Sequence, residues 1–182
     1  MVQNNDKRIL LHACCAICSG YPITLLKELG YIPIVYFCNP NLDTVEEYNK
    51  RLNAQQELCE ALDVELVVEE YNPQEYLDYI QGLENEPEKG KRCDKCIELR
   101  LLKAVQKAKY LGLNKLTTSL TISPHKNFSK ISQIGADISN KFGIEYMAYD
   151  FKKKDGFLKT NKLSKDLNLY RQNYCGCKFA KK

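Results

Sequence analysis

Seven of the nine cysteines in this chain lie in three short groups, HACCAIC, RCDKC and YCGC. In chain order they are Cys14, Cys15, Cys18, Cys93, Cys96, Cys175 and Cys177. Crowded thiolates repel one another unless a cation takes up their charge. Groups separated by long ordinary stretches therefore indicate loops that converge on a metal ion or an iron-sulfur centre. Thiol redox chemistry is the alternative.

A framework of disulfide bonds explains these cysteines less well. Their number is odd, the first residues MVQNNDKR are polar and do not resemble a signal peptide, and 182 residues can form a core without cross-links. We therefore expect reduced thiols and a cytoplasmic protein. We expect no membrane partner, because no apolar run approaches the length of a membrane span. The net charge of +4 permits a nucleic-acid partner without requiring one.

The spacing within two of the groups favours ligation. Cys93 and Cys96 lie at the expected start of a helix, on one side of its first turn, where the helix N-terminus favours thiolates. Asp94 between them could add an oxygen ligand, although acidic residues are ordinary in a first turn. Cys175 and Cys177 are too close in sequence for a relaxed disulfide, which favours shared ligation, or one ligand and one redox thiol.

The remaining cysteines and histidines carry weaker signals. Cys38 and Cys59 are expected to be small apolar residues, with Cys59 in a helix core. Neither His12 nor His125 has the sequence context of a zinc ligand. Seven thiolates and Asp94 exceed the needs of one tetrahedral zinc or one cubane cluster. They indicate two metal centres, or one centre beside a redox pair.

The elements that must position these residues follow an alternating pattern. Apolar runs of strand length alternate with amphipathic stretches, which predicts a single α/β domain with a mostly parallel sheet flanked by helices. Strands are expected at 8–12, 32–37, 64–68, 115–119 and 145–149. Helices are expected at 19–29, 73–82, 93–112 and 129–142. A further long helix is expected to begin after an N-cap at Asp43, with one face formed by Val45, Tyr48, Leu52, Cys59 and Leu62. Beyond Asp150 the chain is lysine-rich and weakly periodic.

Ligands of parallel α/β sheets bind beyond the carboxyl ends of the strands, where several loops meet. HACCAIC lies at such an end, in the turn between the first strand and the first helix. A nucleotide-binding protein would carry a glycine-rich loop there, but the chain has no Walker or Gly-x-Gly-x-x-Gly motif, so phosphate binding at this turn is disfavoured. We interpret 151–182 as a C-terminal extension that returns Cys-Gly-Cys to this site.

Five motifs in this order resemble the cobalamin-independent epoxyqueuosine reductase family known as QueH. They are HACCAIC after the first strand, FCNPN after the second, RCDKC at a helix start, TSLTISPHKN at 118–127 and YRQNYCGC at 170–177. They extend from Leu11 to Cys177, nearly the whole chain. One departure is Cys38, where the family usually has an aromatic residue.

The resemblance implies an oxidoreductase that catalyses the last step of queuosine biosynthesis. The reaction is the two-electron deoxygenation of epoxyqueuosine at the wobble position of transfer RNA. The implied fold is related to the adenine-nucleotide alpha-hydrolase group and is Rossmann-like. A [4Fe-4S] cluster would be held by Cys14, Cys15, Cys93 and Cys96. A second metal ion, iron or zinc, would lie among Cys18, Asp94 and one or both of Cys175 and Cys177.

The chemistry of these residues suits that reaction. An oxophilic ion with Asp94 as its one hard ligand can polarise the epoxide oxygen, while a cluster supplies electrons singly. Tyr174 is a candidate proton donor. Lys126, Arg171 and the lysines at 152–154 are candidates for binding transfer RNA, although each could equally be an ordinary solvated charge. The electron donor is an unidentified partner.

Two other functions compete with this interpretation. One is an ATP-dependent transfer-RNA sulfur-transfer enzyme, which shares the fold type and uses cysteines, although its Ser-Gly-Gly phosphate signature is missing here. The other is a non-enzymatic, zinc-stabilised RNA-binding module. Zinc-thiolate sites have no visible chromophore, so visible absorbance after anaerobic purification would separate a cluster protein from such a module.

Overall fold

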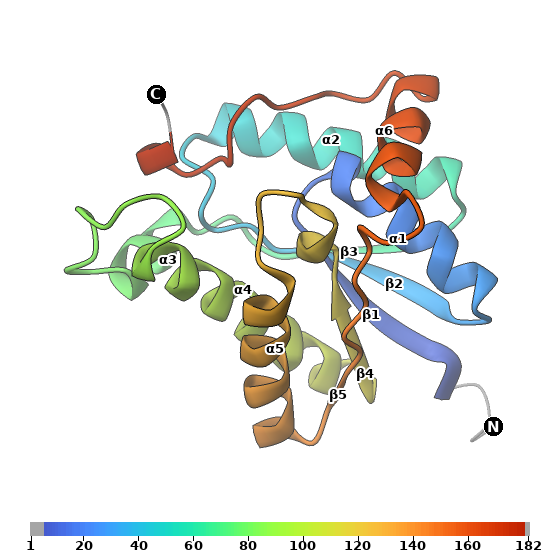
Figure 1. Cartoon of the computed structure of the whole chain (residues 1–182), viewed down its shortest axis with the longest axis horizontal. Helices are drawn as coiled ribbons and strands as arrows, with labels where there is room; N and C mark the ends of the chain where they lie inside the picture. Colours follow the sequence, from blue (N-terminus) through green and yellow to red (C-terminus); the bar gives the residue numbers. More distant parts are fainter. Residues whose placement is uncertain (1–5, 181–182) are drawn as a thin grey trace.

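A five-stranded parallel sheet with the strand order β3-β2-β1-β4-β5 forms the centre of the computed structural model (Figure 1). The strands are β1 (Arg8–Ala13), β2 (Ile32–Phe37), β3 (Glu65–Val68), β4 (Lys115–Thr118) and β5 (Glu145–Tyr146). The structure describes residues 6–180, so both ends of the expected domain, 1–5 and 181–182, lie outside the described residues. The predicted parallel α/β sheet is confirmed.

Helices cover both faces of this sheet. They are α1 (Ala16–Glu28), α2 (Val45–Ala61), α3 (Pro73–Tyr79), α4 (Lys91–Tyr110), α5 (Phe128–Phe142) and α6 (Gly156–Asp166), with short 3-10 helices η2 (Ser119–Ile122) and η3 (Lys178–Ala180). The layer of α1 and α2 lies on one face, and α4 and α5 lie on the other (Figure 1). Within 6–180, none of the helices is long and apolar enough to cross a membrane.

The central strand β1 supplies both layers of the core, because successive side chains of a strand point to opposite faces. Leu10 belongs to the cluster formed with α4 and α5, whereas Ile9 and Leu11 belong to the cluster formed with α1 and α2. Cys59 is 3% exposed in the second cluster, which confirms its predicted place in the core. Cys38 is likewise buried, in the first cluster.

Two predicted helix starts and one predicted helix face were wrong in detail. Helix α1 begins at Ala16 rather than at Ser19, which places Cys18 in its first turn. The N-cap of α2 is Thr44 and not Asp43, because the Thr44 side chain accepts a hydrogen bond from the Glu47 N–H. Val45 is 49% exposed, so the buried face of α2 begins later than predicted.

Polar side chains occupy part of that buried face. Glu47, Arg51 and Gln55 are buried in α2, which an apolar pattern could not indicate. Arg51 Nε donates to Glu47 Oε1 over 2.6 Å, and Gln55 accepts from Ser19 Oγ. These hydrogen bonds replace those that the buried side chains would make with water. The last predicted strand is also shorter than expected, since β5 contains only Glu145–Tyr146.

The weak periodicity beyond Asp150 concealed a helix. Helix α6 packs along α1, and its buried residues are small: Gly156, Thr160 and Ser164. Thr160 Oγ1 donates to the carbonyl of Ile17 and accepts from the N–H of Tyr21. Its hydroxyl therefore bridges two backbone groups of α1 that lie one turn apart. Leu163 and Leu167 are only partly buried against the core, so no fully buried apolar stripe gave α6 a periodic signal.

Candidate metal centre

The turns that follow β1, β2 and β4 meet around the HACCAIC loop. Asn39, after β2, donates from Nδ2 to the carbonyl of Ala13 over 3.0 Å. The N–H of Cys14 donates to Ser119 Oγ over 3.1 Å, and the Ser119 hydroxyl donates to Cys14 Sγ over 3.4 Å. Backbone and side-chain bonds from two neighbouring turns therefore fix the first cysteine of the motif.

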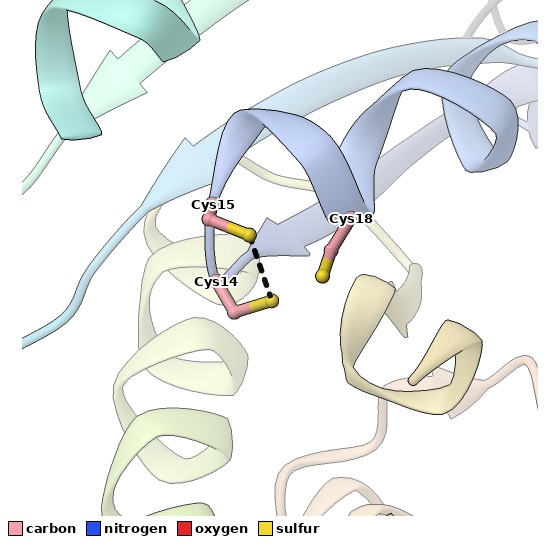
Figure 2. Close-up of side chains that lie close together, drawn as sticks. All are labelled: Cys14, Cys15 and Cys18. Atoms are coloured by element: carbon pink, nitrogen blue, oxygen red, sulfur yellow. Dashed lines mark hydrogen bonds between the residues drawn. The ribbon is translucent and has the colours of Figure 1, made fainter. Parts of the chain in front are cut away.

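The three cysteines of this loop form one compact group. Their sulfur atoms all lie within 4.8 Å of one another, and those of Cys14 and Cys15 are 4.0 Å apart (Figure 2). Figure 2 also shows the Cys18 side chain pointing from α1 toward the other two sulfurs. Cys15 occupies the N-cap position of α1, and Cys18 follows one turn later. The local fold of the strand-to-helix turn thus gathers all three thiols.

The pKa shifts of these three cysteines favour one thiolate at a time. Hydrogen bonds from Cys15 and Cys18 hold the pKa of Cys14 well below its usual range. The same contact with Cys14 raises the pKa of Cys15 to about 12 and raises that of Cys18 as well. Three adjacent thiolates would repel one another, whereas a thiophilic metal would compensate all three charges. The donor set therefore fits a soft metal ion or an iron-sulfur cluster.

His12 links the strands behind the cysteines. Its ring is fully buried, with Nε2 3.2 Å from the carbonyl of Cys38 and Nδ1 3.0 Å from Thr118 Oγ1. A carbonyl can only accept, so Nε2 carries the proton and Nδ1 accepts from the Thr118 hydroxyl. Burial lowers the pKa of His12 to about 4, and the ring is neutral. His12 is therefore packed at the end of β1, which agrees with its lack of a zinc-ligand sequence context.

The cysteines of α4 and of YCGC are separate from this group of three. Among residues 6–180, no cysteine of α4 or of YCGC joins the 4.8 Å group. Cys93 Sγ accepts the N–H of Lys89 over 3.2 Å, and burial raises the pKa of Cys96 to about 11. Cys96 packs in one cluster with Cys177, which is 6% exposed. Cys93, Cys96 and Cys177 therefore form a second thiol-rich region beside the start of α4.

Asp94 forms an ion pair between two helices. Its Oδ2 lies 2.7 Å from Nζ of Lys130 in α5, and its side chain is 28% exposed. The carboxylate does not line the pocket described below. An oxygen-ligand role for Asp94 stays a prediction, and the carboxylate would have to leave Lys130 to fulfil it.

Helix α2 holds the Cys-Gly-Cys segment. Arg51 donates from its two terminal nitrogens to the carbonyls of Tyr174 and Cys175, each over 3.1 Å. The N–H of Asp43 donates to the carbonyl of Gly176 over 2.9 Å, and the Tyr174 hydroxyl donates to Asp43 Oδ1 over 2.6 Å. Figure 1 shows the C-terminal segment running beside α2 after α6.

A pocket of about 960 Å³ lies between these segments. Its wall includes Cys14, Cys15, Cys18, Tyr174, Cys175, Arg100, Lys126, Arg171, His125 and Asn41. Cys175 is exposed at this wall, whereas Cys177 is buried away from it, so the two cysteines of YCGC have different environments. Cys93, Cys96 and Asp94 do not line it.

Basic side chains surround the pocket. Lys126 is half-buried; burial opposes a rise of its pKa, but the nearby cysteines, Cys175 first, raise that pKa above its usual value. Arg171 is exposed and donates to Asn161 Oδ1 over 2.6 Å. Lys152 Nζ donates to the carbonyl of Lys126 over 3.2 Å. Of the candidates for binding transfer RNA, Lys126 and Arg171 thus line the same pocket.

Sequence reasoning missed three polar residues at this site. Arg100 is 4% exposed and Asn41 is 2% exposed, and both line the pocket. Within 6–180, Arg100 Nε and Asn41 Oδ1 are buried without a hydrogen-bond partner. Asn39 accepts from Arg100 over 3.3 Å. One unused signal was the position of Arg100 one helical turn after Cys96, and the other was the pair of asparagines in the Asn-Pro-Asn turn.

Comparison with known proteins identifies related sequences along nearly the whole chain. The family model described as "Epoxyqueuosine reductase QueH" matches residues 9–182. A protein of that name from Streptococcus pyogenes serotype M1 is 38% identical over 180 residues, covering 96% of this chain and 70% of the relative. Another from Staphylococcus epidermidis is 36% identical over 181 residues, covering 95% and 76%.

Two solved structures share the fold at low sequence identity. The U34-tRNA thiolase NcsA from Methanococcus maripaludis, solved with its [4Fe-4S] cluster, superposes with a TM-score of 0.62 at 14% identity over 98% of this chain and 62% of that one. A predicted tRNA methyltransferase subunit from Methanocaldococcus jannaschii gives 0.56 at 13% identity over 84% and 75%. The chain therefore shares the overall fold of these two structures.

Proposed function

The chain belongs to the epoxyqueuosine reductase QueH family, and we propose that its 960 Å³ pocket is where epoxyqueuosine in transfer RNA is reduced to queuosine. Family membership gives the activity, an oxidoreductase reaction in queuosine biosynthesis, and decides against sulfur transfer and against a non-enzymatic RNA-binding module. One observation carries the location. The three clustered thiols, Cys175 and the basic residues Lys126 and Arg171 all face the same cavity.

The reaction sets the requirements of the site. The epoxide oxygen leaves as water, which consumes two electrons and two protons for each alkene formed. We propose that Cys14, Cys15, Cys93 and Cys96 hold a [4Fe-4S] cluster, and that Cys18, Asp94 and Cys175 or Cys177 surround a second ion, iron or zinc. When bound, the cluster supplies electrons one at a time and the ion polarises the epoxide oxygen.

The donor chemistry supports this division. The sulfur atom of Cys18 lies within 4.8 Å of the two proposed cluster ligands Cys14 and Cys15, which favours neighbouring centres. Cys175 is the exposed cysteine of its pair and lies on the pocket wall, so it is the better candidate for a ligand next to substrate. Buried Cys177 would serve in the second thiol-rich region beside Cys96.

The remaining roles concern the transfer RNA. Lys126 and Arg171 would bind phosphate groups of the anticodon loop, with the wobble base turned into the pocket. Tyr174 would supply a proton. Burial and its hydrogen bond to Asp43 raise the pKa of Tyr174, so the hydroxyl keeps its proton at neutral pH. That proton now points to Asp43, so transfer to substrate requires rotation of the hydroxyl.

The C-terminal extension completes the site in this proposal. Residues 151–182 would return Cys-Gly-Cys to the cavity, with α6 anchored on α1 and with Tyr174 and Cys175 anchored on α2. The hydrogen bonds of Thr160 to α1 and of Arg51 to Tyr174 and Cys175 support this role.

A single-turnover assay tests the proposal. Anaerobic protein, epoxyqueuosine transfer RNA and dithionite as the electron source should yield queuosine, which nucleoside mass spectrometry detects. Cys175→Ser should lose nearly all conversion, and buried Cys59→Ser should keep it. Full conversion by Cys175→Ser would exclude this cysteine from the reacting site. Absence of conversion by an iron-loaded parent protein would contradict the activity itself.

A further inference from the structure

Arg100 is a buried cation whose counter-ion is missing from the protein side chains around it. Its side chain is 4% exposed, and among residues 6–180 no carboxylate oxygen lies within 4.0 Å of its guanidinium. Within the described residues its guanidinium donates a hydrogen bond to the neutral Asn39 over 3.3 Å, and its Nε has no hydrogen-bond partner. Buried charges are costly unless they are paired, so this environment requires a negative charge from another source.

Sulfur atoms are the candidates for that negative charge. Arg100 follows Cys96 by one turn on α4 and lines the pocket together with Cys14 and Cys175. Asn39, which accepts from Arg100, also donates to the carbonyl of Ala13, next to Cys14. The guanidinium therefore lies near Cys14 and Cys175 of the pocket and near Cys96 of α4.

The electrostatics agree with this placement. Burial alone would lower the pKa of Arg100, but the nearby cysteines Cys96, Cys175, Cys14 and Cys38 raise it. In turn, burial raises the pKa of Cys96, and the positive charge of Arg100 opposes this rise. The basic groups of other elements differ in exposure, since Lys126 is half-buried and Arg171 is exposed to solvent.

We propose that Arg100 is the counter-ion of the thiolate-bound cluster and raises its reduction potential. This inference rests on the proposed function, because it requires the cluster proposed for Cys14, Cys15, Cys93 and Cys96. A fixed positive charge in a buried site stabilises the added electron, whereas exposed charges are screened by water and salt. Arg100 acts on electron transfer through the field at the centre and makes no contact with substrate.

The test is a redox titration of the anaerobically reconstituted protein, monitored by electron paramagnetic resonance. Arg100→Gln should lower the equilibrium constant of one-electron reduction at least tenfold, a shift of ~59 mV to more negative potential. Arg100→Lys, which keeps the charge, should stay near the parent. Arg171→Gln removes an exposed charge from the same wall and should shift the potential much less.

Each outcome decides the matter. An unchanged potential in Arg100→Gln with full iron content overturns the inference, and so does an equal shift in Arg100→Lys. If Arg100→Gln folds but loses its iron while Arg100→Lys retains it, the result supports the need for a positive charge at this position. Loss of iron from both folded variants overturns it. Weaker binding of transfer RNA at unchanged potential would make Arg100 a phosphate ligand instead. A parent without a cluster refutes the proposed cofactor as well.

Discussion

Arg51 holds Cys175 by its backbone, with a guanidinium nitrogen 3.1 Å from the Cys175 carbonyl oxygen. The same guanidinium is paired at 2.6 Å with Glu47, and both side chains are less than 9% exposed. A buried ion pair in α2 is therefore used to fix an otherwise exposed cysteine at the pocket. The pair connects the stability of the domain to the geometry of the candidate site.

Arg51→Met should destabilise the protein and reduce turnover. It leaves Glu47 buried without its cation, a loss expected to cost about 3–5 kcal/mol in the free energy of unfolding. Urea denaturation measures that cost. The double variant Glu47→Gln with Arg51→Met should recover part of the stability yet still convert epoxyqueuosine slowly, because Cys175 remains unheld. Parent-like turnover of the double variant would show that this clamp does not position Cys175.

Gly176→Ala should disrupt the same segment from the other side. Gly176 has a φ of +111°, and a Cβ there would lie 2.3 Å from Leu42 Cδ2 and 2.9 Å from Arg51. The control is Gly30→Ala, where φ is +85° and a Cβ would meet nothing within 4 Å. We expect a large loss of turnover in Gly176→Ala, and in the control a loss of stability of about 1–2 kcal/mol with unchanged turnover. Similar turnover in both variants would contradict a tightly fixed Cys-Gly-Cys turn.

Asp94 and Lys130 give a matched pair of variants. If Asp94 binds the second ion, Asp94→Ala should keep most of the cubane, lose the extra metal and lose nearly all turnover. Lys130→Ala removes the partner seen at 2.7 Å and should keep the metal. If the carboxylate serves only the ion pair, both variants should cost about 0–1 kcal/mol and leave turnover unchanged. Metal analysis with single-turnover conversion separates the two cases.

The fold could be predicted to the extent that it is encoded locally. Apolar runs predict the sheet, and cysteine spacing predicts the ligand candidates without any knowledge of the geometry of the folded chain. Helix α6 was not predicted, because its fully buried residues include Thr160 and Ser164, which are not apolar. These residues pack on α1, which is far away in sequence. Gly20 allows that approach, since a Cβ there would lie 2.8 Å from Leu163 Cδ2.

The unpredicted parts of the site are also non-local. Arg51 reaches a segment 124 positions later, and the ion pair of Asp94 joins two helices. Sequence spacing could suggest that Cys175 and Asp94 are ligands, but could not reveal what holds each side chain. Arg100 looked like an ordinary helical arginine, because only the folded arrangement shows that its guanidinium is buried.

Serine variants of the cysteines should separate ligands from core residues. Cys93→Ser or Cys96→Ser should abolish the visible absorbance of the anaerobic protein, because a proposed cluster ligand is lost. Cys59→Ser should retain the absorbance and lose only stability, since Cys59 is 3% exposed in the apolar core, with Gln55 Nε2 3.5 Å from its sulfur. Equal bleaching in all three variants would assign Cys59 to the centre or indicate a general loss of folding, which circular dichroism distinguishes.

The metal and sulfide content of the protein purified without oxygen decides whether the chain holds an iron-sulfur cluster. The surplus of thiols over one tetrahedral site predicts about four iron and four sulfide per chain, plus one further metal ion, with broad visible absorbance. The measurement combines elemental analysis, labile sulfide assay and the absorption spectrum of one sample. A single zinc per chain without sulfide, persisting after anaerobic reconstitution with iron and sulfide, would contradict the cluster on which this account depends.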